Sequence, residues 1–105
     1  MNELSLASVT EEQVYAALCE VYDPELGINV VDLGLVYDVA VKESLVEVTM
    51  TMTTPGCPMH EAITEGARTA VGLLPGVGEA RVNVVWFPPW DPSLMSAAAR
   101  RELRG

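Results

Sequence analysis

The strictest pattern in this sequence is an alternation of apolar and polar residues over positions 46–53. Valine and methionine occupy the even positions, and one glutamate and three threonines occupy the odd positions. Side chains of a β-strand point alternately to the two faces of its sheet, so a period of two predicts a strand with one buried face. The rest of the chain must therefore supply elements that cover this one face.

Two further segments are expected to join this strand in a sheet. Residues 35–41 alternate weakly, and residues 42–44 form a suitable turn for an antiparallel hairpin with the strand that follows. Residues 82–86 also alternate, which predicts a third strand that is stopped by Pro88 and Pro89. The sheet is therefore expected to be small and three-stranded.

Three segments carry apolar residues at helical spacing. The first, residues 11–22, begins with a capping box in which Thr10 and Gln13 can satisfy each other's backbone N–H groups. The second covers residues 59–74 and lies between two breaks that contain proline and glycine. The third covers residues 92–103, with an aspartate as its cap and proline at its first position.

The resulting order, α-β-β-α-β-α, predicts an α+β two-layer sandwich with helices on a small mixed three-stranded sheet. We expect one domain over residues 1–105, with residues 1–9 as a flexible N-terminus. No apolar run approaches the ~20 residues of a membrane helix, and the first eight residues lack the features of a signal peptide. A cytoplasmic protein with no membrane partner is therefore expected.

Charge is distributed unevenly along the chain, which has a net charge of −9. Residues 1–65 hold twelve acidic groups and one basic group, whereas residues 66–105 hold five basic and three acidic groups. A domain with this much negative charge repels the phosphate backbone of nucleic acids. We therefore expect no nucleic-acid partner. The basic residues Arg100, Arg101 and Arg104 are interpreted as favourable charge near a helix C-terminus, with a docking site as the alternative.

Cys57 is the strongest candidate for chemistry. It lies in a proline-flanked turn directly before the second predicted helix, where unpaired N–H groups and the helix dipole favour a thiolate. A thiolate can ligate a soft metal or an iron–sulfur cluster, or attack an electrophile. The alternative is a small buried hydrophobe, which is the common fate of a free cysteine.

Carboxylates and a histidine are the other candidate ligands. Asp23 and Glu25 flank a rigid proline and could act as oxygen ligands or a proton relay, although they could also be solvated acids at a helix end. His60 follows Cys57 by three residues and would lie near it on a helix, as a possible further ligand or, less favoured, as the base of a thiol enzyme. Asp32 has apolar neighbours and is expected to accept backbone hydrogen bonds.

Cysteine and histidine alone offer too few ligands for a zinc site. The chain has two cysteines and one histidine, and a structural zinc site needs four ligands. In the expected cytoplasmic setting both cysteines should be reduced, and Cys19 is expected to pack beside the first helix. Trp86, Pro89 and Trp90 could form a partner surface or close one edge of the core.

Three segments together resemble the SufT/PaaD-type family of small iron–sulfur cluster assembly proteins. They are residues 23–37 (DPELGINVVDLGLVY), 50–58 (MTMTTPGCP) and 86–90 (WFPPW). With the helices between them, the resemblance covers nearly the whole chain from about residue 10. It implies the α+β order given above, and a role as a non-enzymatic accessory or carrier factor in the maturation of iron–sulfur proteins.

The resemblance also implies roles for individual residues. The family's cysteine falls on Cys57, its acidic pair on Asp23 and Glu25, and its threonines on Thr53 and Thr54. The implied cargo is iron or an iron–sulfur cluster, bound transiently, because one thiolate cannot supply the four that a cluster typically needs. The implied partners are the iron–sulfur assembly machinery and client apoproteins, and a homodimer could complete the ligand set.

Two departures from the family favour the short, stand-alone form. The chain has no cysteine-rich C-terminal segment like that of the phenylacetate-degradation branch, and no P-loop like that of relatives fused to an ATPase. An adapter that recruits a client protein or an oxygenase component, as in the PaaD-like branch, remains the main alternative. A thiol-dependent hydrolase or transferase is a third, less favoured interpretation.

Overall fold

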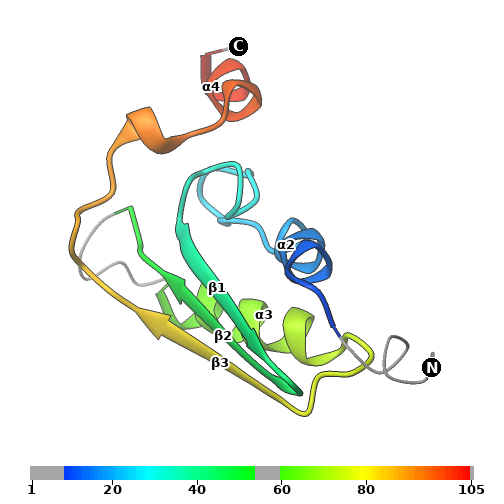
Figure 1. The fold of residues 1–105 in the computed structure, drawn as a ribbon. Helices are drawn as coiled ribbons and strands as arrows, with labels where there is room; N and C mark the ends of the chain where they lie inside the picture. Colours follow the sequence, from blue (N-terminus) through cyan, green and yellow to red (C-terminus); the bar gives the residue numbers. More distant parts are fainter. Residues whose placement is uncertain (1–8, 54–59, 105) are drawn as a thin grey trace.

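The computed structural model describes residues 9–53 and 60–104, and its element order is the predicted one with one short 3-10 helix added (Figure 1). In chain order the elements are α2 (Glu11–Leu18), β1 (Val36–Lys42), β2 (Leu45–Met50), α3 (His60–Gly72), β3 (Glu79–Val84), the 3-10 helix η1 (Pro92–Leu94) and α4 (Ala97–Arg104). The α+β prediction is therefore confirmed.

The sheet has the order β1-β2-β3, with β1 antiparallel and β3 parallel to the central strand β2. Helix α3 connects the two parallel strands and packs on β3, while α2 packs on β1 and on α3. The sheet and these two helices form the two layers of the predicted sandwich (Figure 1).

The alternation in β2 produces the core. Val46, Val48 and Met50 are fully buried, and the residues between them are half-buried. Val39 of β1 and Val82 of β3 pair with Val48, so all three lie at one level of the sheet. Burying a side chain of this size contributes about 1.5–3 kcal/mol, so this face supplies much of the stability of the fold.

The opposite face of the sheet is polar. Arg81 on β3 is paired with Glu79 at 2.8 Å and lies 3.8 Å from Glu47 on β2. Exposed ion pairs such as these contribute at most about 1 kcal/mol each. The prediction of one buried and one polar face is confirmed.

The first helix is shorter than its apolar spacing predicts. Its capping box is present, with Thr10 Oγ1 accepting from the N–H of Gln13 at 3.1 Å. The helix ends at Leu18 rather than near residue 22, because the next residues pair with the loop instead. The N–H of Val30 donates to the carbonyl of Val21 at 2.9 Å, which holds that segment extended.

The last predicted helix is divided into two. Asp91 caps only η1, and Met95 then adopts an extended conformation with ψ 147°. The hydroxyl of Ser96 accepts from the N–H of Ala99 at 3.1 Å. Ser96 is therefore the N-cap of a second helix, α4. The prediction of one continuous helix was wrong because Ser96 offers its own N-terminal cap.

The third strand also ends earlier than predicted. It stops at Val84 instead of residue 86, although the N–H of Val85 still donates to the carbonyl of Met50 at 2.8 Å. The prediction for the N-terminus concerns residues 1–8, which lie outside the described residues, and Val9, which is buried in the core. None of the described helices has the length and apolar character needed to cross a bilayer.

Candidate functional site

The segments that carry the family resemblance meet at one end of the sheet. The register places Val36, Met50 and Val84 at one level, so β1 begins where β2 and β3 end. Figure 1 shows the start of α3 and the segment after β3 at this same end. Topology therefore brings together segments that are far apart in the sequence.

Two predicted site residues, Thr54 and Cys57, lie outside the described residues. Their described neighbours are Thr53, which follows β2, and His60, which begins α3, and both are half-buried. The ring of His60 lies against the indole of Trp86, with 5.9 Å between ring centroids and an edge-to-face angle of 70°. This contact joins the start of α3 to the chain after β3.

Asp23 is buried and holds the loop that follows α2. Its side chain is 3 % exposed, and Oδ1 accepts from the backbone N–H groups of Glu25 at 2.7 Å and Leu26 at 3.1 Å. Its backbone is also bonded, because its N–H donates to the carbonyl of Ile28 at 3.0 Å and its carbonyl accepts from Gly27 at 2.8 Å. The carboxylate of Asp23 therefore shapes a closed turn.

The two members of the acidic pair have different surroundings. Glu25 is exposed on the turn that Asp23 holds, whereas Asp23 is enclosed by it. A buried acceptor with two backbone donors is already occupied, while an exposed carboxylate keeps its oxygens available to a ligand. Asp23 thus shapes the turn, and Glu25 is exposed to solvent on that turn.

Asp32 accepts a hydrogen bond from a side chain, which differs from the expected backbone donors. Its Oδ2 accepts from Nδ2 of Asn29 at 2.8 Å, and its N–H donates to Oδ1 of the same residue at 2.9 Å. Asn29 lies three residues before Asp32, and its side-chain amide carries both a donor and an acceptor. It can therefore bond the carboxylate and the backbone N–H of Asp32 together. The carbonyl of Asp32 also accepts from the N–H of Ser96 at 2.8 Å.

The segment from residue 85 to residue 96, which we call the C-terminal strap, is hydrogen-bonded to the loop between α2 and β1 and to the start of β1. Nε1 of Trp90 donates to the carbonyl of Leu33 at 2.7 Å, and the hydroxyl of Tyr37 donates to the carbonyl of Pro88 at 2.8 Å. With the bond between Ser96 and Asp32, three hydrogen bonds fix the strap. The strap therefore forms one wall of the site.

The predicted aromatic surface is divided between two roles. Trp90 is half-buried and its indole N–H is used inside the molecule, whereas Trp86, Phe87 and Pro89 are exposed. Phe87 is the most exposed of them, at 83 %. Trp90 thus holds the strap against the rest of the molecule, while Trp86, Phe87 and Pro89 form an exposed apolar surface on it.

A cavity of about 170 Å³ lies between the end of β2 and the strap. It is lined by the following six residues: Thr51, Met52, Thr53, Trp86, Pro89 and Trp90. Thr51 is 1 % exposed, and its hydroxyl has no hydrogen-bond partner in the described part of the chain. Thr51 therefore contributes a buried polar side chain to the lining of this cavity.

The role of Thr51 was missed by sequence reasoning. Its place in the alternation predicts an outward-facing strand residue, but the strap covers it. The run of threonines that approaches the cysteine was the available signal. It drew attention to Thr53 and Thr54 rather than to Thr51.

Over residues 9–53 and 60–104, no three histidine, cysteine or carboxylate side chains lie close enough to share a metal ion. Cys19 is a half-buried free thiol. Its burial raises the pKa of the thiol, and the carboxylates of Asp32 and Glu20 raise it further. Cys19 therefore remains a protonated thiol at neutral pH and is a poor ligand, as expected for a packing residue.

Comparison with known proteins gives consistent results. A family model described as "Iron-sulfur cluster assembly protein" matches residues 11–84. The "Fe-S protein maturation auxiliary factor YitW" of Bacillus subtilis is 44 % identical over 91 residues, which are 86 % of this chain and 89 % of the relative. The "Fe-S protein maturation auxiliary factor SufT" of Staphylococcus aureus is 46 % identical over 81 residues, which are 76 % of this chain and 92 % of the relative.

A solved structure shares the fold. The crystal structure of a domain of unknown function from Bacillus anthracis superposes with a TM-score of 0.85 at 46 % identity. The match covers 90 % of this chain and 91 % of that one. At this identity and coverage the two chains share the fold.

Proposed function

The chain belongs to the iron–sulfur cluster assembly protein family, and we propose that it acts as an auxiliary factor in the maturation of iron–sulfur proteins. Two relatives with more than 40 % identity carry this function in their names. The proposed role is non-catalytic and cytoplasmic, with the assembly machinery and client apoproteins as partners. The convergence of the family segments at one end of the sheet is the observation that carries the proposal.

In this function Cys57 is the ligand that receives iron or a cluster and passes it on. In the sequence, Cys57 lies between Thr53, which follows β2, and His60, which begins α3, and this position supports the proposal. One thiolate supplies a single bond to a cluster that typically needs four. The cargo is therefore held transiently, and the donor or the client supplies the remaining ligands.

The acidic pair contributes unequally to this site. Glu25 is exposed and can add an oxygen ligand, while Asp23 positions the turn that presents it. His60 is a further nitrogen donor at the start of α3, although its contact with Trp86 also has a packing role. The proposed ligand set is thus Cys57 with Glu25, supported by Asp23.

Replacing Cys57 by serine is expected to abolish cargo binding. Anaerobic reconstitution with ferrous iron and sulfide should give iron–sulfide absorption with the unaltered protein, and at least about tenfold less with Cys57→Ser, because a hydroxyl is a poor ligand for this soft site. Absorption spectra and iron content measure the difference, followed by transfer to the apo form of a [4Fe–4S] enzyme.

Cys19→Ser is the matched control for this experiment. It removes the other thiol of the chain, which is half-buried and has a raised pKa, and should leave reconstitution unchanged. If Cys57→Ser binds iron and sulfide as well as Cys19→Ser does, the ligand role of Cys57 is wrong. Equal transfer by both variants would also remove the carrier role.

The exposed aromatic residues favour an adapter function as a second candidate. Trp86 and Phe87 offer a partner an apolar surface beside the cavity. Trp86→Ala/Phe87→Ala is expected to slow transfer to the apoenzyme by about tenfold while reconstitution stays intact, since hot-spot aromatics typically contribute 2 kcal/mol or more. Unchanged transfer by this variant would contradict the use of this surface by clients.

A further inference from the structure

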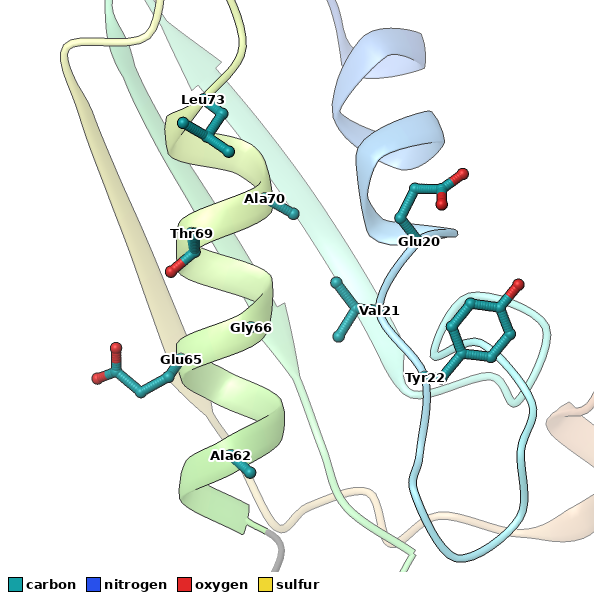
Figure 2. A pocket seen from close by; sticks show the side chains of 9 residues that line it. All are labelled: Glu20, Val21, Tyr22, Ala62, Glu65, Gly66, Thr69, Ala70 and Leu73. Carbon is teal, nitrogen blue, oxygen red and sulfur yellow. The ribbon is translucent and has the colours of Figure 1, made fainter.

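A groove of about 560 Å³ runs between α3 and the residues that follow α2. Figure 2 shows α3 on one side, with Ala62, Gly66 and Ala70 along it, and the segment of Val21 on the other. Leu73, at one end of the groove, is 78 % exposed. The residues of this apolar floor are not among those of the proposed cargo site.

The charges along the groove are acidic. Glu20 and Glu65 line it, and its remaining lining residues carry no charge. Arg68 pairs with Glu65, but both side chains are more than half exposed, so this contact is weak and can be exchanged for another. The groove therefore favours an occupant with a small apolar face and basic side chains.

Helix α4 of this same chain has that chemistry. It buries Ala99 toward its own molecule, whereas Ala97 and Arg101, four residues apart and so on one face of the helix, are both exposed. Arg100 is exposed as well. Glu102 and Leu103 are exposed on α4 too, and Arg100 donates to the carbonyl of Ser93 in its own molecule at 2.8 Å. The two exposed arginines outweigh this one glutamate, so the exposed part of α4 has a charge opposite to that of the groove.

The shape of the molecule makes α4 accessible to another copy. The described chain measures 48 × 26 × 22 Å, and its radius of gyration is 14.2 Å, compared with about 13 Å for a compact chain of this length. Figure 1 shows α4 at one extremity, beyond the strap and away from the sheet. A helix that projects in this way can reach a neighbouring molecule.

We propose that α4 of one copy docks into the groove between α3 and the residues after α2 of a second copy, and that the second copy reciprocates. A two-fold axis makes the two contacts identical, so each arginine-bearing helix meets the carboxylates of Glu20 and Glu65. The contact would cover Leu73 and the apolar floor of the groove. Because it depends on charge, the dimer weakens as salt is added.

A charge exchange tests this directly by sedimentation equilibrium. Arg100→Glu/Arg101→Glu makes α4 acidic, and Glu20→Arg/Glu65→Arg makes the groove basic. Each variant alone is expected to self-associate at least about tenfold more weakly than the unaltered protein, because like charges then face each other. An equimolar mixture of the two should restore a dimer, since each helix then meets a groove of opposite charge.

Lys42→Glu/Arg81→Glu is the matched control. It changes the net charge by the same amount as the α4 variant, but on the uncovered face of the sheet, and should leave the dimer intact. A monomeric unaltered protein at low salt, a dimer that persists in both variants, or a mixture without heterodimer would each overturn the proposal. If the groove variant loses cargo transfer while the unaltered protein is monomeric, a basic helix of a partner is the occupant instead of α4. These outcomes do not depend on whether Cys57 binds iron.

Discussion

Replacing Gly34 by alanine is expected to lower the free energy of unfolding by about 2–5 kcal/mol, from backbone strain and steric overlap together. Gly34 has a φ of +80°, and an added Cβ would overlap the backbone carbonyl of Leu94. That carbonyl cannot easily withdraw, because hydrogen bonds through Trp90 and Ser96 hold the strap on both sides. Urea denaturation gives the energy, and thermal melting should shift by about 10 °C or more.

Gly27→Ala separates the two causes. Gly27 has a φ of +70°, but a Cβ there would meet no atom within 4 Å, so only the backbone cost of about 1–2 kcal/mol applies. Tryptophan emission should also shift to longer wavelength in Gly34→Ala, since Trp90 loses its enclosed position, and should stay unchanged in Gly27→Ala. Equal losses of stability in the two variants would show that contact with the strap is not the cause.

Asp23→Ala is expected to lower the free energy of unfolding by about 2–4 kcal/mol. The substitution leaves the N–H groups of Glu25 and Leu26 without the buried carboxylate that accepts from them, and hydrogen bonds to a charged acceptor contribute about 1.5–3 kcal/mol each. Denaturation curves measure the loss. A variant as stable as the unaltered protein would mean that the turn does not depend on this carboxylate.

Asp23→Asn tests whether this residue positions the site or binds cargo. The asparagine keeps an oxygen in place of Oδ1 but removes the charge, so about half of the stability loss or less is expected. As a positioning residue, Asp23 should tolerate this change in iron–sulfide reconstitution, whereas Glu25→Gln should reduce the bound iron. Loss of iron in Asp23→Asn with a stable fold would instead make Asp23 a ligand.

Local signals in the sequence predicted the elements well because their causes are local. The capping box of Thr10 and Gln13 involves residues three apart, and the alternation in residues 46–52 records which face each side chain takes. Both depend on neighbouring residues and need no knowledge of the remaining chain. The fold class followed from them.

Errors arose where a competing partner decides the conformation. Val21 has helical spacing, but its carbonyl accepts from Val30, and this pairing ends α2 early. Ser96 lies within a helical pattern, but its hydroxyl caps a new helix. In the first case a bond set by tertiary context outweighs a weak local preference, whereas the cap of Ser96 joins residues three apart and is a local feature that the helical spacing concealed.

The arrangement of the described candidate residues could not be predicted from the sequence. Asp23 and Glu25 look equivalent in sequence, and burial alone distinguishes the residue that shapes the turn from the one that is presented. The alternation could not show that Thr51 is buried and shares a cavity with Trp90, which comes from near the end of the chain. Such features require the packed structure.

The strap has a consequence for how the protein is made. The bond between Trp90 and Leu33 spans 57 positions, and that between Tyr37 and Pro88 spans 51. Contacts this distant in sequence form late, after local pairing is complete. During translation β1 and β2 can therefore pair first. The cavity between the end of β2 and the strap remains open until nearly all of the chain has left the ribosome. An unfinished chain would lack the residues of the strap that line this cavity.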